Sequence, residues 1–120
     1  MKLITAVIRP ECFPQTKEAL EDFGIHGMTI SDAAGYGAQH GHREDYHGHR
    51  EVYRGASYTV ALLQKIRVEI LAEDSQTPRI VQVIVDAART EVPGDGKVWV
   101  LPVEEAVRVR TGERDDAALT

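Results

Sequence analysis

The sequence has almost nothing from which a disulfide or a thiolate metal site could be built, because Cys12 is the only cysteine among 120 residues. It also lacks any apolar run near the roughly 18 to 20 residues that a membrane-spanning helix requires. The apolar stretch at 1–8 is too short for a signal peptide and runs into Arg9-Pro10 without a small-residue cleavage site. We therefore expect a cytoplasmic protein in a reducing compartment, with no insertion into a membrane.

An excess of positive charge is absent as well. Lysine and arginine number 14 against 19 aspartate and glutamate residues, which gives a formal net charge of −5. General nucleic-acid binding needs a basic surface that displaces counterions from phosphates, so this balance argues against DNA or RNA as a partner. A local basic pocket for one nucleotide is still compatible with it. No serine, cysteine or histidine stands beside an evident acid–base partner, and we expect a protein that is not an enzyme.

The apolar pattern predicts one domain over residues 1–112, followed by a small, charged tail over 113–120. The predicted elements are a strand over 3–8, a helix over 13–23, a strand from 28 into the glycines at 35 and 37, a long loop, a strand over 58–72, a helix over 78–89, a strand over 97–103 and a short strand over 107–110. This order is that of the ferredoxin-like α+β fold, βαββαβ, in which two helices cover one face of an antiparallel sheet. Because the other sheet face would stay uncovered, we expect an oligomer.

The long loop carries a tandem duplication. Residues 40–46, HGHREDY, are followed at once by 47–53, HGHREVY, and six of the seven positions are identical. The segment is polar and bears glycine, which predicts a mobile functional loop rather than a segment of the core. Its four histidines, at 40, 42, 47 and 49, form two His-x-His pairs that suit a metal ion, but nothing in a loop preorganises them. The duplication alone accounts for their number, so a metal site is the less favoured interpretation.

Gly94-Asp95-Gly96-Lys97, together with Arg108 and Arg110, is the strongest candidate for a binding site. Two glycines let backbone N–H groups approach an anion, and the lysine adds a positive charge. The two arginines, two residues apart on a predicted strand, would share one face and hold a phosphate. Other interpretations stay open, because Gly-Asp-Gly is a common turn and paired arginines often lie on a solvated face. Gly35-Tyr36-Gly37 is similarly either a strand end or a close approach of the backbone to a ligand.

Several segments, in the same order along nearly the whole chain, resemble the PII family of nitrogen-regulatory signal-transduction proteins. They are the first strand at 1–10, the start of the family's long T-loop at 35–42, the end of that loop at 53–58, the B-loop at 87–90 and 94–97, and the C-loop at 108–113. The resemblance implies a homotrimer with three clefts between its subunits, which bind ATP, ADP or AMP. The residues that it assigns to the nucleotide are Thr29, Gly35, Gly37, Leu71, Gly94, Asp95, Gly96, Lys97, Arg108 and Arg110.

The resemblance also implies an effector and a regulated partner. In the family, Mg²⁺-ATP and 2-oxoglutarate bind together; here Gln39 would ligate the magnesium and contact the effector, and Lys65 would pair with a carboxylate of the acid. Nucleotide and effector would set the conformation of the T-loop, about 37–58, and so decide whether it docks on a membrane transporter or an enzyme of nitrogen metabolism. Tyr58 matches the tyrosine that is modified in the family.

Three departures from the family pattern leave two functions open. Ala38 stands where an arginine usually reaches the terminal phosphate, and Glu91-Val92-Pro93 replaces a stretch that usually begins with glycine. The T-loop carries the duplication and has Ser57 in place of an acidic residue. The first function is a nitrogen sensor that reads ATP and ADP with 2-oxoglutarate. The alternative is a divergent PII-like sensor of ADP or AMP with another small anion, such as bicarbonate, that is linked to carbon metabolism.

Overall fold

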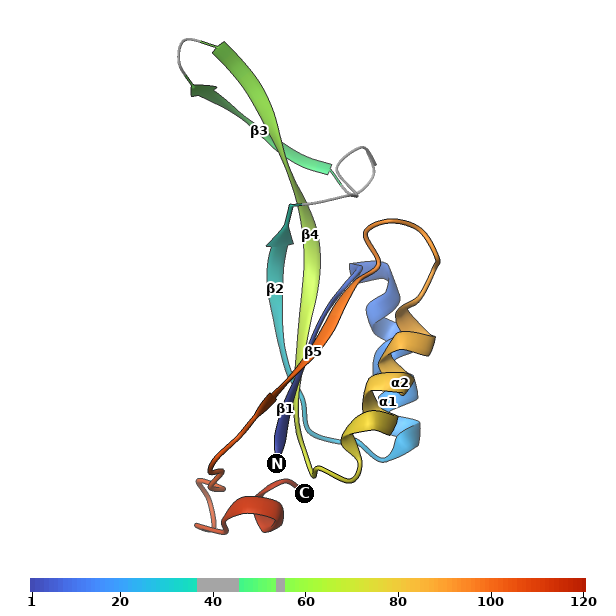
Figure 1. Cartoon of the computed structure of the whole chain (residues 1–120), viewed down its shortest axis with the longest axis vertical. Helices are drawn as coiled ribbons and strands as arrows, with labels where there is room; N and C mark the ends of the chain where they lie inside the picture. Colours follow the sequence, from blue (N-terminus) through green and yellow to red (C-terminus); the bar gives the residue numbers. More distant parts are fainter. Residues whose placement is uncertain (37–45, 54–55) are drawn as a thin grey trace.

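The computed structural model describes residues 1–36, 46–53 and 56–120, and over these residues a pair of helices lies on one face of an antiparallel sheet (Figure 1). Its elements are β1 (Lys2–Ile8), η1 (Pro10–Cys12), α1 (Phe13–Phe23), β2 (Thr29–Gly35), β3 (Tyr46–Tyr53), β4 (Ala56–Ala72), α2 (Thr77–Ala88), β5 (Gly96–Pro102) and η3 (Asp115–Ala118). The predicted ferredoxin-like α+β fold is confirmed. Within these residues, no helix has both the length and the apolar character needed to cross a membrane.

The sheet has the strand order β2-β4-β1-β5, and every neighbouring pair is antiparallel. β1 lies inside the sheet, where Ile4 is opposite both Ile70 of β4 and Val100 of β5. β4 has 17 residues, more than twice the seven of β1, so it continues beyond the sheet. Its first residues pair with β3 instead of β2. β4 therefore joins the sheet to the C-terminal end of the predicted T-loop.

The core lies between the sheet and the two helices. Ile4 and Ile8 of β1 are buried against Leu20 of α1 and Ile80 and Ile84 of α2. Each such side chain contributes roughly 1.5 to 3 kcal/mol when it leaves water. The same apolar periodicity that predicts these elements from the sequence is thus what packs them together.

The first helix ends at the residue that the sequence predicts. Gly24 has a φ of 114°, and its N–H donates to the carbonyl oxygens of Leu20 and Glu21 at 3.2 and 3.0 Å. A left-handed glycine at this position satisfies carbonyls that the helix leaves without partners. The chain then reverses and enters β2.

The sheet face away from the helices carries apolar side chains that the described residues leave exposed. Strand register places Leu3 between Leu71 and Leu101, and Trp99 opposite Thr5 in the adjacent row. Leu71 and Trp99 are each 43% exposed, and Leu101 is 51% exposed. A contiguous apolar patch of this kind is typical of a surface that another protein covers. The exposed patch is consistent with the expectation that a partner covers this face of the sheet.

Two local predictions are wrong. A stretch of the predicted loop is a strand, because β3 pairs with β4 from Tyr46 opposite Leu63 to Tyr53 opposite Ala56. The long β4 offers backbone groups beyond the sheet, and the loop residues satisfy them by pairing. The predicted strand over 107–110 is absent: the chain turns there, with the Gly112 N–H donating to the Arg108 carbonyl at 2.8 Å.

Gly96, at the start of β5, gives a test of the fold. Its φ is 104°, and a Cβ at this position would lie 1.7 Å from the carbonyl oxygen of Val7. We therefore expect Gly96→Ala to lower the free energy of unfolding by more than about 2 kcal/mol, measured by urea denaturation at one protein concentration. Gly27→Ala is the matched control, because its Cβ would meet nothing within 4 Å. Equal stability of the two variants would contradict the packing described here.

Candidate functional site

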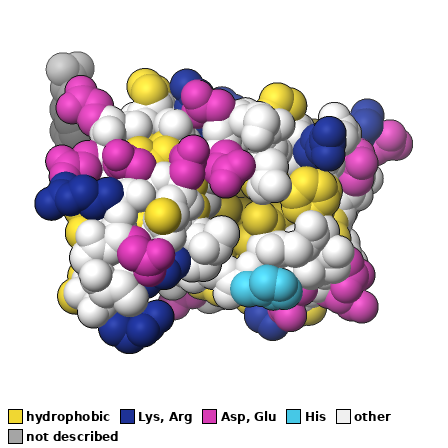
Figure 2. Space-filling view, turned by 90° about the horizontal axis from the view of Figure 1, so that it is seen from below, with side chains coloured by type: hydrophobic (Ala, Val, Ile, Leu, Met, Phe, Trp, Pro, Cys, Tyr) yellow, Lys and Arg dark blue, Asp and Glu magenta, His cyan; other side chains and the backbone are white. Residues whose placement is uncertain are grey.

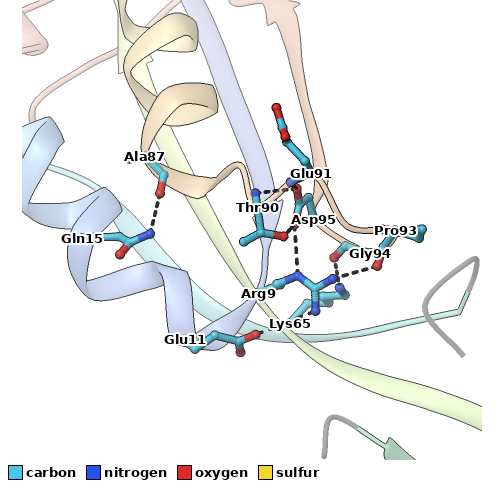
Figure 3. A network of polar contacts seen from close by, with 10 residues as sticks. All are labelled: Arg9, Glu11, Gln15, Lys65, Ala87, Thr90, Glu91, Pro93, Gly94 and Asp95. Atoms are coloured by element: carbon cyan, nitrogen blue, oxygen red, sulfur yellow. Dashed lines mark hydrogen bonds and ion pairs between the residues drawn. The ribbon is translucent and has the colours of Figure 1, made fainter. Parts of the chain in front are cut away.

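The segment that runs from the end of α2 into the first two residues of β5, residues 89–97, is organised around one carboxylate (Figure 3). We refer to this segment as the loop 89–97. Asp95 Oδ2 accepts hydrogen bonds from the backbone N–H groups of Thr90 and Glu91, at 2.7 and 2.9 Å. Its Oδ1 accepts the Thr90 hydroxyl and the Nε–H of Arg9, the latter at 3.1 Å. These donors tie the first residues of the loop to its last ones, so the loop has a defined shape without a ligand.

Arg9 fastens this loop to the end of β1. Its side chain is 7% exposed, and its Nη2 donates to the carbonyl oxygen of Pro93 at 2.7 Å. Glu11 adds a carboxylate 3.8 Å from Nη1. Asp95 is 23% exposed, so the pair is partly buried, and removing the carboxylate would leave the nearly buried guanidinium without its partner. Arg9 and Asp95 therefore depend on each other.

Lys65 of β4 contacts the same loop from another element. Its Nζ donates to the carbonyl oxygen of Gly94 at 2.5 Å, and the residue is 6% exposed. Gly35 of β2 lies beside it, since a Cβ at Gly35 would approach Lys65 Cγ to 3.3 Å. The structure thus brings together four of the residues that the resemblance assigns to ligand binding: Gly35, Lys65, Gly94 and Asp95.

The hydrogen bonds also stabilise the ionised form of Asp95. Burial by itself raises the pKa of Asp95, but the hydrogen bonds from Thr90, Arg9 and Glu91 outweigh it and lower that pKa from its ordinary value of 3.8 to about 2. The folded chain therefore favours the ionised carboxylate more strongly than water does, and groups of the same chain bind it. The sequence assigns Asp95 to the nucleotide, whereas its acceptor atoms are directed to the loop itself.

Positive charge is left on the outside of this loop. Lys97 is exposed, and among the residues that the structure describes it has no ion-pair partner. Gly94 and Gly96, with φ of 100° and 104°, flank Asp95 in the left-handed conformation that anion-binding turns use. The cavity that Lys97 lines has a volume of about 200 Å³. Sites for whole small-molecule ligands are about 300 to 1,000 Å³, so this cavity alone is too small for a ligand of that class.

Other predicted nucleotide residues lie at the opposite end of the sheet, where both termini are found (Figure 1). Thr29 and Leu71 line one cavity of about 440 Å³, together with Ala118 and Leu119 of the tail. An adjoining hollow of about 670 Å³ shares Leu71 and the two tail residues. Figure 2 views this end and shows apolar side chains among polar and acidic ones.

Lys97, Arg108 and Arg110 do not form a phosphate cluster within one chain. Lys97 lies near the start of β5, and both arginines follow its far end. Seven residues of strand span about 20 Å, which separates the two groups. The arginines also share no strand face: Arg108 is paired with Glu113, and Arg110 is exposed in the turn. The predicted site is therefore divided between the two ends of the molecule.

Several predicted residues are outside the described residues. Gly37, Ala38 and Gln39 are among them, as are His40 and His42. The backbone of Tyr58 lies in β4 and pairs with Glu51 of β3. Among the described residues, no group of three or more histidine, cysteine, aspartate or glutamate side chains is arranged to hold a metal ion. The roles of Gln39, Tyr58 and the loop histidines stay predictions.

Sequence reasoning missed Arg9 as a member of the site. Its bonds to Pro93 and Asp95 join residues more than 80 positions apart, and no local pattern encodes such a contact. The one available signal is an arginine directly before Pro10, at the end of an apolar strand. A cation at that point needs an acceptor from elsewhere in the chain, because the core beside it is apolar.

Comparison with known proteins gives a consistent result. The family described as Nitrogen regulatory protein P-II matches residues 1–113. Proteins of that name are 46% identical in Microchaete diplosiphon, 45% in Azospirillum brasilense and 43% in Rhodospirillum rubrum, each over 119 residues. These alignments cover 99% of this chain and the full length of each relative.

The ionised Asp95 predicts how stability depends on pH. Because its pKa is lowered on folding, the stabilisation is complete above about pH 4 and is lost as the pH falls toward about 2. At neutral pH we expect the natural chain to have a larger unfolding free energy than Asp95→Asn. This difference in unfolding free energy should decrease by about 2 kcal/mol as the pH falls from about 4 to about 2. Asp22→Asn, on the exposed surface of α1, is the control. A difference that does not change with pH would show that Asp95 is not held as described.

Proposed function

The chain belongs to the nitrogen regulatory protein P-II family, and from this premise we propose that it binds adenine nucleotide and passes that signal to a partner protein. As a family member it is a signal-transduction regulator. The ligands we propose are ATP or ADP with Mg²⁺ and 2-oxoglutarate. The regulated partner is a membrane transporter or an enzyme of nitrogen metabolism, contacted by the T-loop.

The observation that carries this proposal is the preformed loop 89–97. Arg9 and Lys65 hold its carbonyl groups and Asp95 from the inside, while Lys97 is exposed on the outside. A loop that is already ordered loses little conformational entropy when it binds an anion. The arrangement suits the phosphates of a nucleotide, which need fixed N–H donors and a positive charge at close range.

The divided site supports binding between two copies of the chain. In a ring, each interface joins one surface of a subunit to a different surface of its neighbour. Such an interface can bring the Lys97 end of one copy to the Thr29, Leu71 and Arg108 end of the next. The exposed apolar sheet face, with Trp99 and Leu101, would then be covered inside the ring. We propose the homotrimer of the family as this ring.

Lys65 supports a link between effector and loop. Its ammonium group donates to the Gly94 carbonyl at 2.5 Å, and a carboxylate of 2-oxoglutarate is a stronger acceptor for the same group. The effector would therefore draw Lys65 toward itself and alter the contact between β4 and the loop. Because the first residues of β4 pair with β3, this change would reach the T-loop, where Tyr58 is the proposed modification site.

One observation favours the alternative, a sensor of ADP or AMP with bicarbonate. Glu91 lies in the loop with a φ of 67°, and its carboxylate is 3.5 Å from the guanidinium of Arg89. This acidic side chain offsets a positive charge beside the proposed phosphate site. Together with Ala38 in place of the usual arginine, it lowers the advantage of a third phosphate, so we propose that discrimination of ATP over ADP is slight.

Calorimetric titration with ADP tests the site. We expect Lys97→Ala and Arg108→Ala each to weaken ADP binding by about tenfold to a hundredfold, the effect of losing a hydrogen bond to a charged group. Arg79→Ala, which removes an exposed cation of α2, is the matched control and should leave the affinity unchanged. Unaltered ADP affinity in both site variants would remove the assignment.

A further inference from the structure

The chain folds back on itself after β5. Val107 forms a bridge with Arg114, and the Arg108 N–H donates to the Glu113 carbonyl at 2.8 Å. The Asp115 N–H donates to the Ala106 carbonyl at 2.8 Å, which starts the short helix η3. Residues 113–120, which we call the C-terminal strap, therefore lie against the turn that carries Arg108.

The strap engages both terminal nitrogens of the Arg108 guanidinium. Nη1 donates to Glu113 Oε1 at 2.6 Å, and Nη2 donates to the carbonyl oxygen of Thr120. The Thr111 hydroxyl donates to the same Glu113 oxygen at 2.8 Å and so fixes the carboxylate. The Arg108 side chain is left 22% exposed. An arginine in this state has few donors available for a phosphate.

The same strap lies over the cavity at this end of the sheet. Ala118 and Leu119 are half-buried and line the cavity of about 440 Å³ together with Thr29 and Leu71. A flat aromatic base that entered this cavity would have to share it with the two strap residues. The strap thus contacts the guanidinium of Arg108 and also lines the apolar cavity of the same candidate site.

We propose that the C-terminal strap is an autoinhibitory element that competes with nucleotide for Arg108 and for the adjoining cavity. This inference rests on the proposed function, because it takes Arg108 as a phosphate ligand. Carboxylate and phosphate bind a guanidinium through the same paired N–H groups, so Glu113 and a phosphate exclude each other. The apparent affinity for nucleotide is then reduced by the fraction of molecules in which the strap is closed.

The strap is built to open at low cost. Its other ion pair, between Arg114 and Glu105, is exposed, with 64% and 62% of the two side chains accessible. Gly112, at its start, has a φ of 75° and open space around it, which suits a hinge. Few apolar contacts and exposed ion pairs are typical of segments that open without unfolding the rest of a protein.

Calorimetry with ADP tests the competition on the full-length chain. Glu113→Gln removes the charge that holds Arg108, and a second variant that lacks residues 119 and 120 removes the other contact. We expect each to bind ADP about twofold to fivefold more tightly than the natural chain. Glu18→Gln, which removes an exposed acidic charge on α1 instead of one in the strap, is the matched control and should leave ADP affinity unchanged.

The outcomes separate the two proposals. Autoinhibition by the strap is supported if both variants bind ADP more tightly than the natural chain, or if only the variants bind it. Faster amide exchange at Leu119 when ADP is added supports it as well. Unchanged or weaker binding overturns it, since weaker binding would make the strap a component of the bound site. If Arg108→Ala weakens ADP binding while Glu113→Gln leaves it unchanged, the nucleotide site is supported and autoinhibition by the strap is contradicted. If neither the natural chain nor any variant binds ADP, the proposed function fails and the strap with it.

Discussion

The ion pair between Arg9 and Asp95 is the contact on which the candidate site depends. Arg9 comes from the end of β1 and is nearly buried, and Asp95 holds the backbone of Thr90 and Glu91 at the far side of the loop. The left-handed Gly96 follows from this placement, since β5 must begin against β1 with no room for a side chain. Lys97 is then the first side chain of the strand to reach the outside. The fixed interior of the loop and the exposed cation thus lie next to each other in the chain.

The length of β5 sets the second constraint. It places the Lys97 end of the chain about 20 Å from the end that carries Thr29, Leu71 and the strap. Neither end alone offers both an ordered loop flanked by glycines and a large cavity. A regulator that binds nucleotide between copies of itself would make ligand binding depend on assembly, and would let each subunit respond to its neighbour. In this account the strap adds a second control, at the end that lacks the ordered loop.

Local patterns in the sequence predict the elements of the fold that depend on local physics. The helix over 13–23 and its cap at Gly24 follow from periodicity and from one glycine, and the sheet follows from β-branched apolar runs. The strand at β3 could not be predicted in this way, because it forms only where the long β4 offers a partner. The turn at 108–112 replaces a predicted strand for a local reason: the Gly112 N–H closes it through a hydrogen bond to the Arg108 carbonyl. Gly94 and Gly96 indicate the site from the sequence alone. The hydrogen bonds that Asp95 accepts within its own chain could not be predicted in this way, because one of them comes from Arg9, which is distant in the sequence.

The central claim is that one nucleotide site is made from the two ends of two different chains. It is tested most directly by co-assembling Lys97→Ala chains with Arg108→Ala chains and titrating the mixture with ADP. Each variant alone lacks one half of every site, but a mixed ring contains interfaces in which both halves are intact. The account predicts that about a quarter of the sites recover the affinity of the natural protein in an equal, random mixture. No recovery in mixtures that are shown to co-assemble would contradict it.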